Sequence, residues 1–166
     1  MMNLEIDFKD SVRGVTKRIN ISKSNGRSEE LTVNVPPGID DGEMIKYQQK
    51  GEEVSNGIPG DLYVKIHVKS HPTLRKEGDH LVTELDVKIT ESLLGTKKEI
   101  DGVDEKITVK IPANVRHGEV LRVRGKGVKY SALGQGDLLI KINVVTPKKL
   151  SRKAKKALED LANEGL

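Results

Sequence analysis

The chain has no cysteine and no tryptophan, and only one of its 166 residues is phenylalanine. The absence of cysteine excludes disulfide bonds, cysteine-ligated zinc and a cysteine nucleophile. Aromatic side chains supply much of the buried area of compact cores, so their scarcity argues against a single large core. The apolar residues are mainly Val, Ile and Leu, which favour strands. Two thin β domains are therefore expected.

Long apolar runs are also missing. No N-terminal stretch is long enough for a signal peptide or a membrane span, so a soluble, intracellular protein without a membrane partner is expected. The net charge is +4, but basic and acidic residues are interspersed until the last stretch, which is typical of a solvated surface. A basic nucleic-acid-binding module stays an alternative, although aromatic platforms for stacking single strands are missing.

The chain repeats itself. Residues 31–43 (LTVNVPPGIDDGE) match residues 107–119 (ITVKIPANVRHGE), an offset of 76 that also relates Gly60-Asp61 to Gly136-Asp137. An earlier match, of residues 6–14 with 87–95, has an offset of 81, which places a length difference in residues 22–30. Each copy is expected to form a strand, a short helical turn, a strand, a loop, a strand, a long loop and a last strand.

Apolar and polar residues alternate along the predicted strands, as in half-buried strands. The apolar positions are Leu4, Ile6 and Phe8; Ile19 and Ile21; Leu31, Val33 and Val35; Leu62, Val64, Ile66 and Val68; Leu85, Val87 and Ile89; Ile107, Val109 and Ile111; and Leu138, Ile140, Ile142 and Val144. Turns are predicted at Pro37-Gly38, Asp41-Gly42, Asn56-Gly57, Pro59-Gly60 and Asp101-Gly102.

The predicted fold class is all-β: two tandem, internally repeated β-sandwich-like domains with short helices and a C-terminal helix. The first domain is expected to span residues 1–73, the second 74–147, and the C-terminal helix lies within 148–166. That helix places Leu150, Ala154, Ala157, Leu158 and Leu161 on one face, with Ser151 as its cap and Gly165 at its end.

The charges of this helix run against the helix dipole, since basic residues crowd its first half and acidic residues its second. Antiparallel pairing with a second copy would set basic halves against acidic halves. The five apolar residues are therefore predicted to form a homodimer contact. A helix packed on its own domain is the alternative.

No pattern indicates an active site, a cofactor or a metal. The four histidines lack close metal-ligand spacing, and the glycines around Lys126 and Gln135 lack the Walker pattern. Ser11 and Ser92 occupy matching positions outside any nucleophile elbow, so helix capping is expected of them. Binding remains: exposed β edges bind extended peptides, and Ile19 and Ile21 beside Leu4 could form such a groove. Ordinary core is the alternative for these three residues.

Seven segments occur in the order found in one family: residues 4–17, 35–42 (VPPGIDDG), 60–64 (GDLYV), 71–79 (HPTLRKEGD), 92–95 (SLLG), 124–127 (RGKG) and 136–139 (GDLL). With them the chain resembles the C-terminal substrate-binding region of DnaJ-family co-chaperones over its whole length. The family's J domain is absent, because His71-Pro72 is followed by Thr73 rather than Asp. The cysteine-rich zinc module is also absent, as in the CbpA-like branch, and residues 22–30 stand in its place.

The resemblance implies a co-chaperone fragment that binds apolar segments of unfolded polypeptides and delivers them to a DnaK-type chaperone. It implies a C-terminal helix that forms a homodimer. It also implies that an acidic tail of the partner meets the groove's rim. A stand-alone holdase and a purely structural dimerisation scaffold are alternatives. By position, the peptide groove is lined by Met2, Leu4, Ile19, Ile21 and Leu74, with Lys17 at its rim.

Overall fold

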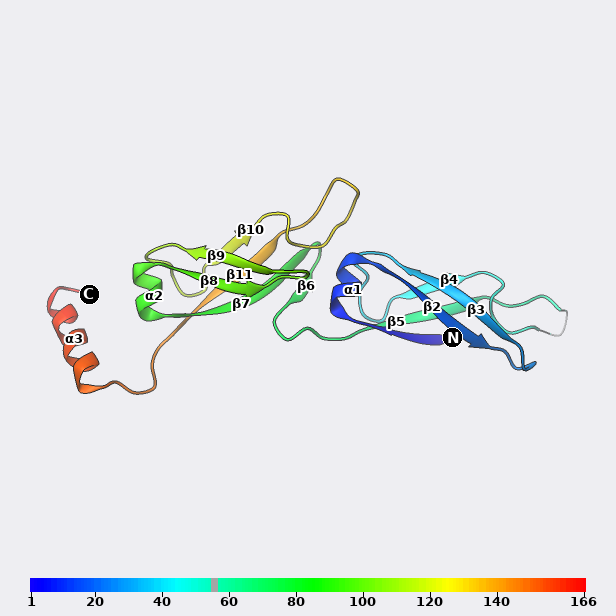
Figure 1. Ribbon diagram of the computed structural model, residues 1–166, viewed down its shortest axis with the longest axis horizontal. Helices are drawn as coiled ribbons and strands as arrows, with labels where there is room; N and C mark the ends of the chain where they lie inside the picture. Colours follow the sequence, from blue (N-terminus) through cyan, green and yellow to red (C-terminus); the bar gives the residue numbers. More distant parts are fainter. Residues whose placement is uncertain (55–56) are drawn as a thin grey trace.

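The computed structural model describes residues 1–54 and 57–166, and its strands form two successive β units (Figure 1). The predicted mainly-β class is confirmed. The first unit contains β1 (Met2–Ile6), α1 (Phe8–Arg13), β2 (Val15–Ser22), β3 (Ser28–Val35), β4 (Met44–Tyr47) and β5 (Leu62–Val68). The second contains β6 (Arg75–Glu77), β7 (His80–Lys88), α2 (Ile89–Leu94), β8 (Thr96–Asp101), β9 (Lys106–Ile111), β10 (Val120–Val123) and β11 (Leu138–Val145).

In the first unit, a three-stranded sheet packs against a hairpin. The sheet has the order β1-β5-β4, with β1 parallel and β4 antiparallel to the central strand β5. Strands β2 and β3 form the hairpin. Alternate residues of β3 and β5 are buried in one cluster, centred on Val33, Val64 and Ile66. The alternation of apolar residues thus builds a thin core between two layers.

The second unit repeats this arrangement with one added strand. Its sheet has the order β10-β11-β7-β6, and β8 and β9 form its hairpin. Leu4 pairs with Ile66 in the first unit, and Leu85 pairs with Ile142 in the second. The pairing register is therefore the same in both copies, so the duplication seen in the sequence is a duplication of the fold.

Several local predictions need correction. Phe8 and Ile89 begin α1 and α2 instead of extending the preceding strands. Ser11 and Ser92 do not cap these helices, because their hydroxyls donate to the carbonyls of Phe8 and Ile89, at 2.7 Å in each case, within the helical turn. The short strands β4, β6 and β10 lie where loops were predicted. The turn predicted at Asn56-Gly57 includes a residue outside the described ones.

Helix α1 lies between the two units (Figure 1). Phe8 and Val12 belong to the core cluster of the second unit, although they come from the first. Lys76 of β6 crosses the same joint: its side chain is only 10% exposed, its ammonium lies 3.1 Å from Asp40, and it donates to the carbonyl oxygens of Gly38 and Ile39. The joint is thus held by apolar packing and by a largely buried cation.

The C-terminal helix α3 (Arg152–Asn163) forms where it was predicted. The Ser151 hydroxyl accepts a hydrogen bond from the Ala154 amide at 3.1 Å, as expected of its cap. None of the residues of α3 is buried. Among the described residues, no helix is long and apolar enough to cross a membrane.

Candidate functional site

Strands β1 and β2 bring four of the predicted groove residues to the edge of the first core. Met2 and Leu4 of β1 and Ile19 of β2 are half-buried against that core, and Ile21 is 9% exposed. The residues between them point outward and are exposed. We call this set of four the predicted β1–β2 groove, or the groove for short. Alternation of side chains along each strand places all four on the core side.

Both strands of the groove have a side without a strand partner among the described residues. Strand β1 is at the edge of its sheet and pairs only with β5, while β2 pairs only with β3. An edge strand presents unpaired amides and carbonyls, which are the groups that an added peptide strand would bind. The groove therefore combines an apolar face with available backbone.

A cleft of about 460 Å³ continues the groove at its far end. Met2 and Ile21 line it together with Lys23, Lys50 and Leu62. Val54 also lines it and is 60% exposed, so the cleft has an apolar wall open to solvent. We call this cavity the outer cleft. It is wide enough for a large apolar side chain, and its rim is polar.

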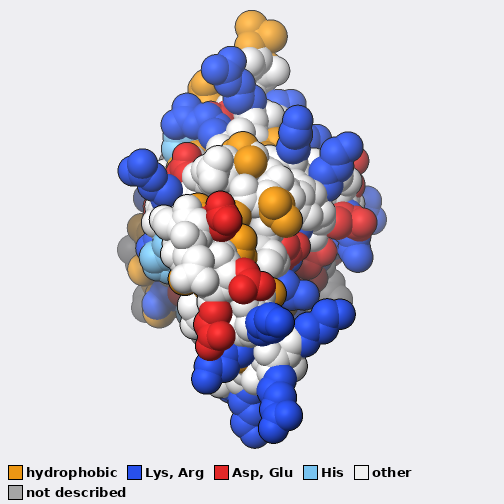
Figure 2. Space-filling view, turned by 90° about the vertical axis from the view of Figure 1, so that its left-hand side faces the viewer, with side chains coloured by type: hydrophobic (Ala, Val, Ile, Leu, Met, Phe, Trp, Pro, Cys, Tyr) orange, Lys and Arg blue, Asp and Glu red, His pale blue; other side chains and the backbone are white. Residues whose placement is uncertain are grey.

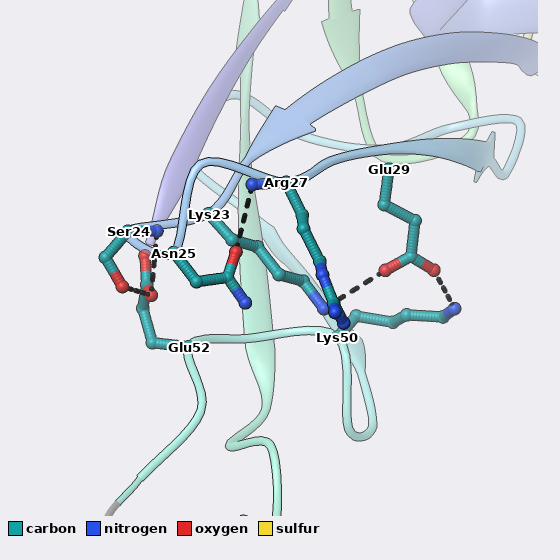
Figure 3. A network of polar contacts seen from close by, with 7 residues as sticks. All are labelled: Lys23, Ser24, Asn25, Arg27, Glu29, Lys50 and Glu52. Atoms are coloured by element: carbon teal, nitrogen blue, oxygen red, sulfur yellow. Dashed lines mark hydrogen bonds and ion pairs between the residues drawn. The ribbon is translucent and has the colours of Figure 1, made fainter.

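The rim of the outer cleft is a network of charged side chains (Figure 3). The Glu29 carboxylate pairs with Lys50 and, at 3.2 Å, with Lys23. These ammonium groups, Lys50 more than Lys23, lower the pKa of Glu29 below its ordinary value. Glu52 accepts hydrogen bonds from the Ser24 hydroxyl and amide, and these lower the pKa of Glu52. The network ties the β2–β3 turn to the loop that follows β4.

The other two predicted site residues are placed differently. Lys17 lies on the same face of β2 as Ile19, is half-exposed, and pairs with Asp10 at 3.5 Å. Leu74 is 4% exposed and packs in the core cluster of the second unit. It lines a different cavity, beside Phe8 at the joint. The structure therefore does not bring Leu74 together with the β1–β2 groove.

Reasoning from the sequence missed the rim residues Lys23, Glu29, Lys50 and Glu52. Lys23, Lys50 and Glu52 lie in a turn and a loop, where periodicity carries no signal, and Glu29 is a polar residue near the start of β3. The repetition of Lys50-Gly51 as Lys126-Gly127 was a sequence signal for Lys50. The glycine is needed because a side chain at Gly51 would come within 2.7 Å of the Asp61 carbonyl oxygen.

Three of the four histidines serve local structure. The Nδ1 atom of His71 accepts from the Leu74 amide at 3.0 Å, that of His80 from Asp137 at 2.9 Å, and that of His117 from Val144 at 3.1 Å. Within residues 1–54 and 57–166, no group of three or more His, Asp or Glu side chains is placed to hold a metal.

The family described as DnaJ C terminal domain matches residues 1–147. The chain belongs to the DnaJ C-terminal domain family.

Among curated relatives of this DnaJ C-terminal domain is the chaperone protein DnaJ of Fusobacterium nucleatum subsp. nucleatum. It is 42% identical over 132 residues, which cover 78% of this chain and 34% of the relative. The chain thus spans about a third of the length of the curated relative that it matches.

Proposed function

We propose that this DnaJ C-terminal domain is the polypeptide-binding part of a co-chaperone and that the β1–β2 groove binds apolar segments of unfolded chains. The observation that carries the proposal is the half-buried apolar face of Met2, Leu4 and Ile19 on strands that each have one side without a strand partner among the described residues. A bound segment would add its backbone to a strand edge and place alternate side chains in the groove and the outer cleft.

Binding at one groove is expected to be weak. Burying a Leu-sized side chain contributes about 1.5–3 kcal/mol, whereas ordering the peptide opposes binding. Two grooves on a dimer would raise the avidity through effective concentration. We propose that two chains pair through α3, where Leu158 and Leu161 are exposed, and through Leu150, which is exposed just before the helix begins. The end of the molecule that carries α3 shows apolar side chains among charged ones (Figure 2).

The proposal includes delivery of the bound segment to a DnaK-type chaperone. The lysines at the rim, Lys17 beside the groove and Lys23 and Lys50 at the outer cleft, supply positive charge where the partner's acidic tail is expected. The short turn between β2 and β3 supports the zinc-less, CbpA-like type, since the cysteine-rich module would occupy this place.

Replacing Ile19 with serine tests the groove. Affinity for a permanently unfolded probe, reduced and carboxymethylated lactalbumin, is expected to fall about tenfold, because one apolar side-chain contact is worth about 1.4 kcal/mol or more. Fluorescence anisotropy of the labelled probe measures this affinity. Ile100→Ser is the matched control, since Ile100 pairs with Ile107 as Ile19 pairs with Leu31.

An Ile19→Ser variant with wild-type circular dichroism and undiminished affinity would overturn the assignment of the groove. A nucleic-acid-binding module would instead bind DNA or RNA with a steep dependence on salt. A purely structural scaffold would leave the probe unbound by every variant and by the wild type.

A further inference from the structure

Strand β11 is an interior strand of the second sheet, and a histidine accepts a backbone hydrogen bond near each of its ends. The Asp137 amide, just before β11, donates to Nδ1 of His80 at 2.9 Å. The Val144 amide, near the end of β11, donates to Nδ1 of His117 at 3.1 Å. A backbone amide nitrogen can only donate, so Nδ1 is the acceptor in both rings and the hydrogen of each neutral ring is on Nε2. We call His80 and His117 the β11 histidines.

The first unit makes the matching contact with a carboxylate. The Val68 amide, at the end of β5, donates to the Asp41 carboxylate at 2.8 Å. The offset of 76 residues between the two copies takes Asp41 to His117 and Val68 to Val144. The same backbone amide is thus held by an aspartate in one unit and by a histidine in the other. An aspartate carboxylate stays an acceptor between about pH 5 and 8, the range in which histidine changes its charge.

Protonation of the β11 histidines removes these acceptors. The added hydrogen goes to Nδ1, the atom that faces the backbone amide, and the charged ring can then only donate. His80 is half-buried, whereas His117 is exposed, so the loss is expected to be larger at His80. The stability that these contacts contribute is present while the rings are neutral, and it is lost as the pH falls through the range in which they gain a proton.

The charged side chains around the β11 histidines come from several elements. Those around His80 are Glu77, opposite it in β6; Asp79, beside it; and Asp137, whose carboxylate pairs with Arg122 of β10 at 3.3 Å. The elements that border His117 carry Arg116 and Glu119 in its own loop, Lys141 in β11, Asp86 in β7 and Glu91 in α2.

None of these carboxylates, among the residues that the structure describes, is placed to pair with a ring of the β11 histidines. His67 of the first unit differs, because its Nδ1 atom lies 3.7 Å from the Asp41 carboxylate. Protonation of His67 therefore gains an ion-pair partner. Protonation of a β11 histidine loses a hydrogen bond and gains no such partner.

We propose that the second unit is a pH-sensitive part of this chain: protonation of His80 and His117 releases both ends of β11, while Asp41 keeps the central strand of the first unit in place. Only residues 146–151 separate β11 from α3, so release of the Val144 end also frees the segment that leads to α3. The inference does not depend on polypeptide binding by the groove, because it concerns the backbone of the second unit alone.

Hydrogen exchange of single amides, followed by NMR on the full chain at about pH 7.5 and 5.5, tests the proposal. Each rate is divided by the intrinsic rate of an unfolded amide at the same pH. Protection of the Asp137 and Val144 amides is expected to fall about fivefold at the lower pH, the ratio that corresponds to one lost hydrogen bond. The Val68 amide should keep its protection and is the internal control.

Two substitutions remove the titration and keep an acceptor. His117→Asp gives the second unit the acceptor of the first, and His80→Asn offers a carbonyl oxygen in place of Nδ1. Each should abolish the pH dependence at its own amide and leave the other amide as in the wild type. The reverse exchange, Asp41→His, should make protection of the Val68 amide depend on pH.

Equal protection of the Asp137 and Val144 amides at the two pH values in the wild type overturns the proposal, and this comparison needs no variant. A pH dependence that persists in the His80→Asn/His117→Asp double variant also overturns it, because another group would then be responsible. An equal loss at the Val68 amide would show that the whole chain loosens, which contradicts a device confined to the second unit.

Discussion

Glu29 shows how a single residue connects two segments that alternation alone does not relate. Its carboxylate holds Lys50, from the loop after β4, and Lys23, from the turn after β2. These contacts lower the pKa of Glu29 below the value of about 4.5 that is ordinary for a glutamate. A group whose pKa is depressed by folding stabilises the folded state above its unfolded pKa, and this contribution is lost as the pH falls through the folded pKa.

The first prediction concerns Glu29→Gln. At neutral pH this variant should be slightly less stable than the wild type, because the ion pairs are solvent-exposed and screened. The difference should shrink as the pH falls below about 4.5 and vanish below the folded pKa. Urea unfolding at a series of pH values measures it. Glu30→Gln, the neighbouring exposed residue, is the control, and a difference that is constant with pH would contradict the prediction.

Residue by residue, the candidate site could be predicted only where the pattern of a strand carries it. Ile19 and Ile21 alternate with polar residues, so the sequence predicts which side of β2 they occupy. The sequence does not predict the burial of Leu74 in the core cluster of the second unit, because that burial depends on how the two units meet. Lys23 and Lys50 come together through a turn and a loop, whose conformations no periodicity determines.

At the scale of elements, β6 is the feature that the second unit adds to the repeat. It covers the start of β7, with Lys76 opposite Leu81. The Asp79–His80 peptide of this hairpin lies directly against Gly136. A Cβ atom added to Gly136 would lie only 1.7 Å from the Asp79 carbonyl oxygen. A Cβ atom added to the matching Gly60 of the first unit would lie 3.7 Å from its nearest neighbour, which is ordinary contact.

The second prediction compares these two glycines. Gly136→Ala should lower the free energy of unfolding by about 1–3 kcal/mol or more, since the β6–β7 hairpin must shift to admit the methyl group. Gly60→Ala, at the same position of the first unit, should cost much less. Urea unfolding of the full chain provides both values. Equal losses would show that the cost lies in the loop conformation and not in contact with the hairpin.

Elements were predictable in proportion to their length and regularity. The strands β2, β3, β5, β9 and β11 follow from alternation, and α3 follows from its apolar face and its serine cap. Strands β4, β6 and β10 have only three or four residues, too few for a pattern. Phe8 continued the alternation of β1, yet it starts α1, as the matching Ile89 starts α2 in the second unit.

On the scale of the whole molecule, two apolar helix surfaces remain uncovered in a single chain. Leu158 and Leu161 of α3 are exposed, and so are Leu93 and Leu94 of α2. A helix of 12 residues is marginal in water without packing. A partner chain that covers α3 would remove both the exposure and the marginal stability.

The third prediction follows from this surface. The wild type should have twice the 18.3 kDa mass of one chain in light scattering, and Leu158→Asp/Leu161→Asp should have the single-chain mass. A charged residue in the contact loses the apolar burial and stays unpaired. Asn163→Asp adds the same charge on the opposite side of α3 and should remain a dimer. A monomeric wild type would rule out the α3 contact.

In each unit, the strand synthesised last is the one in the middle of its sheet: β5 lies between β1 and β4, and β11 between β10 and β7. Met2 finds its partner only when Val64 has left the ribosome, and at the usual speed of translation that wait lasts roughly 3–12 s. Throughout this interval the nascent chain carries uncovered apolar strands. Each newly made copy therefore exposes apolar strands twice, once for each unit. In that state it resembles the unfolded chains that the folded protein is proposed to bind.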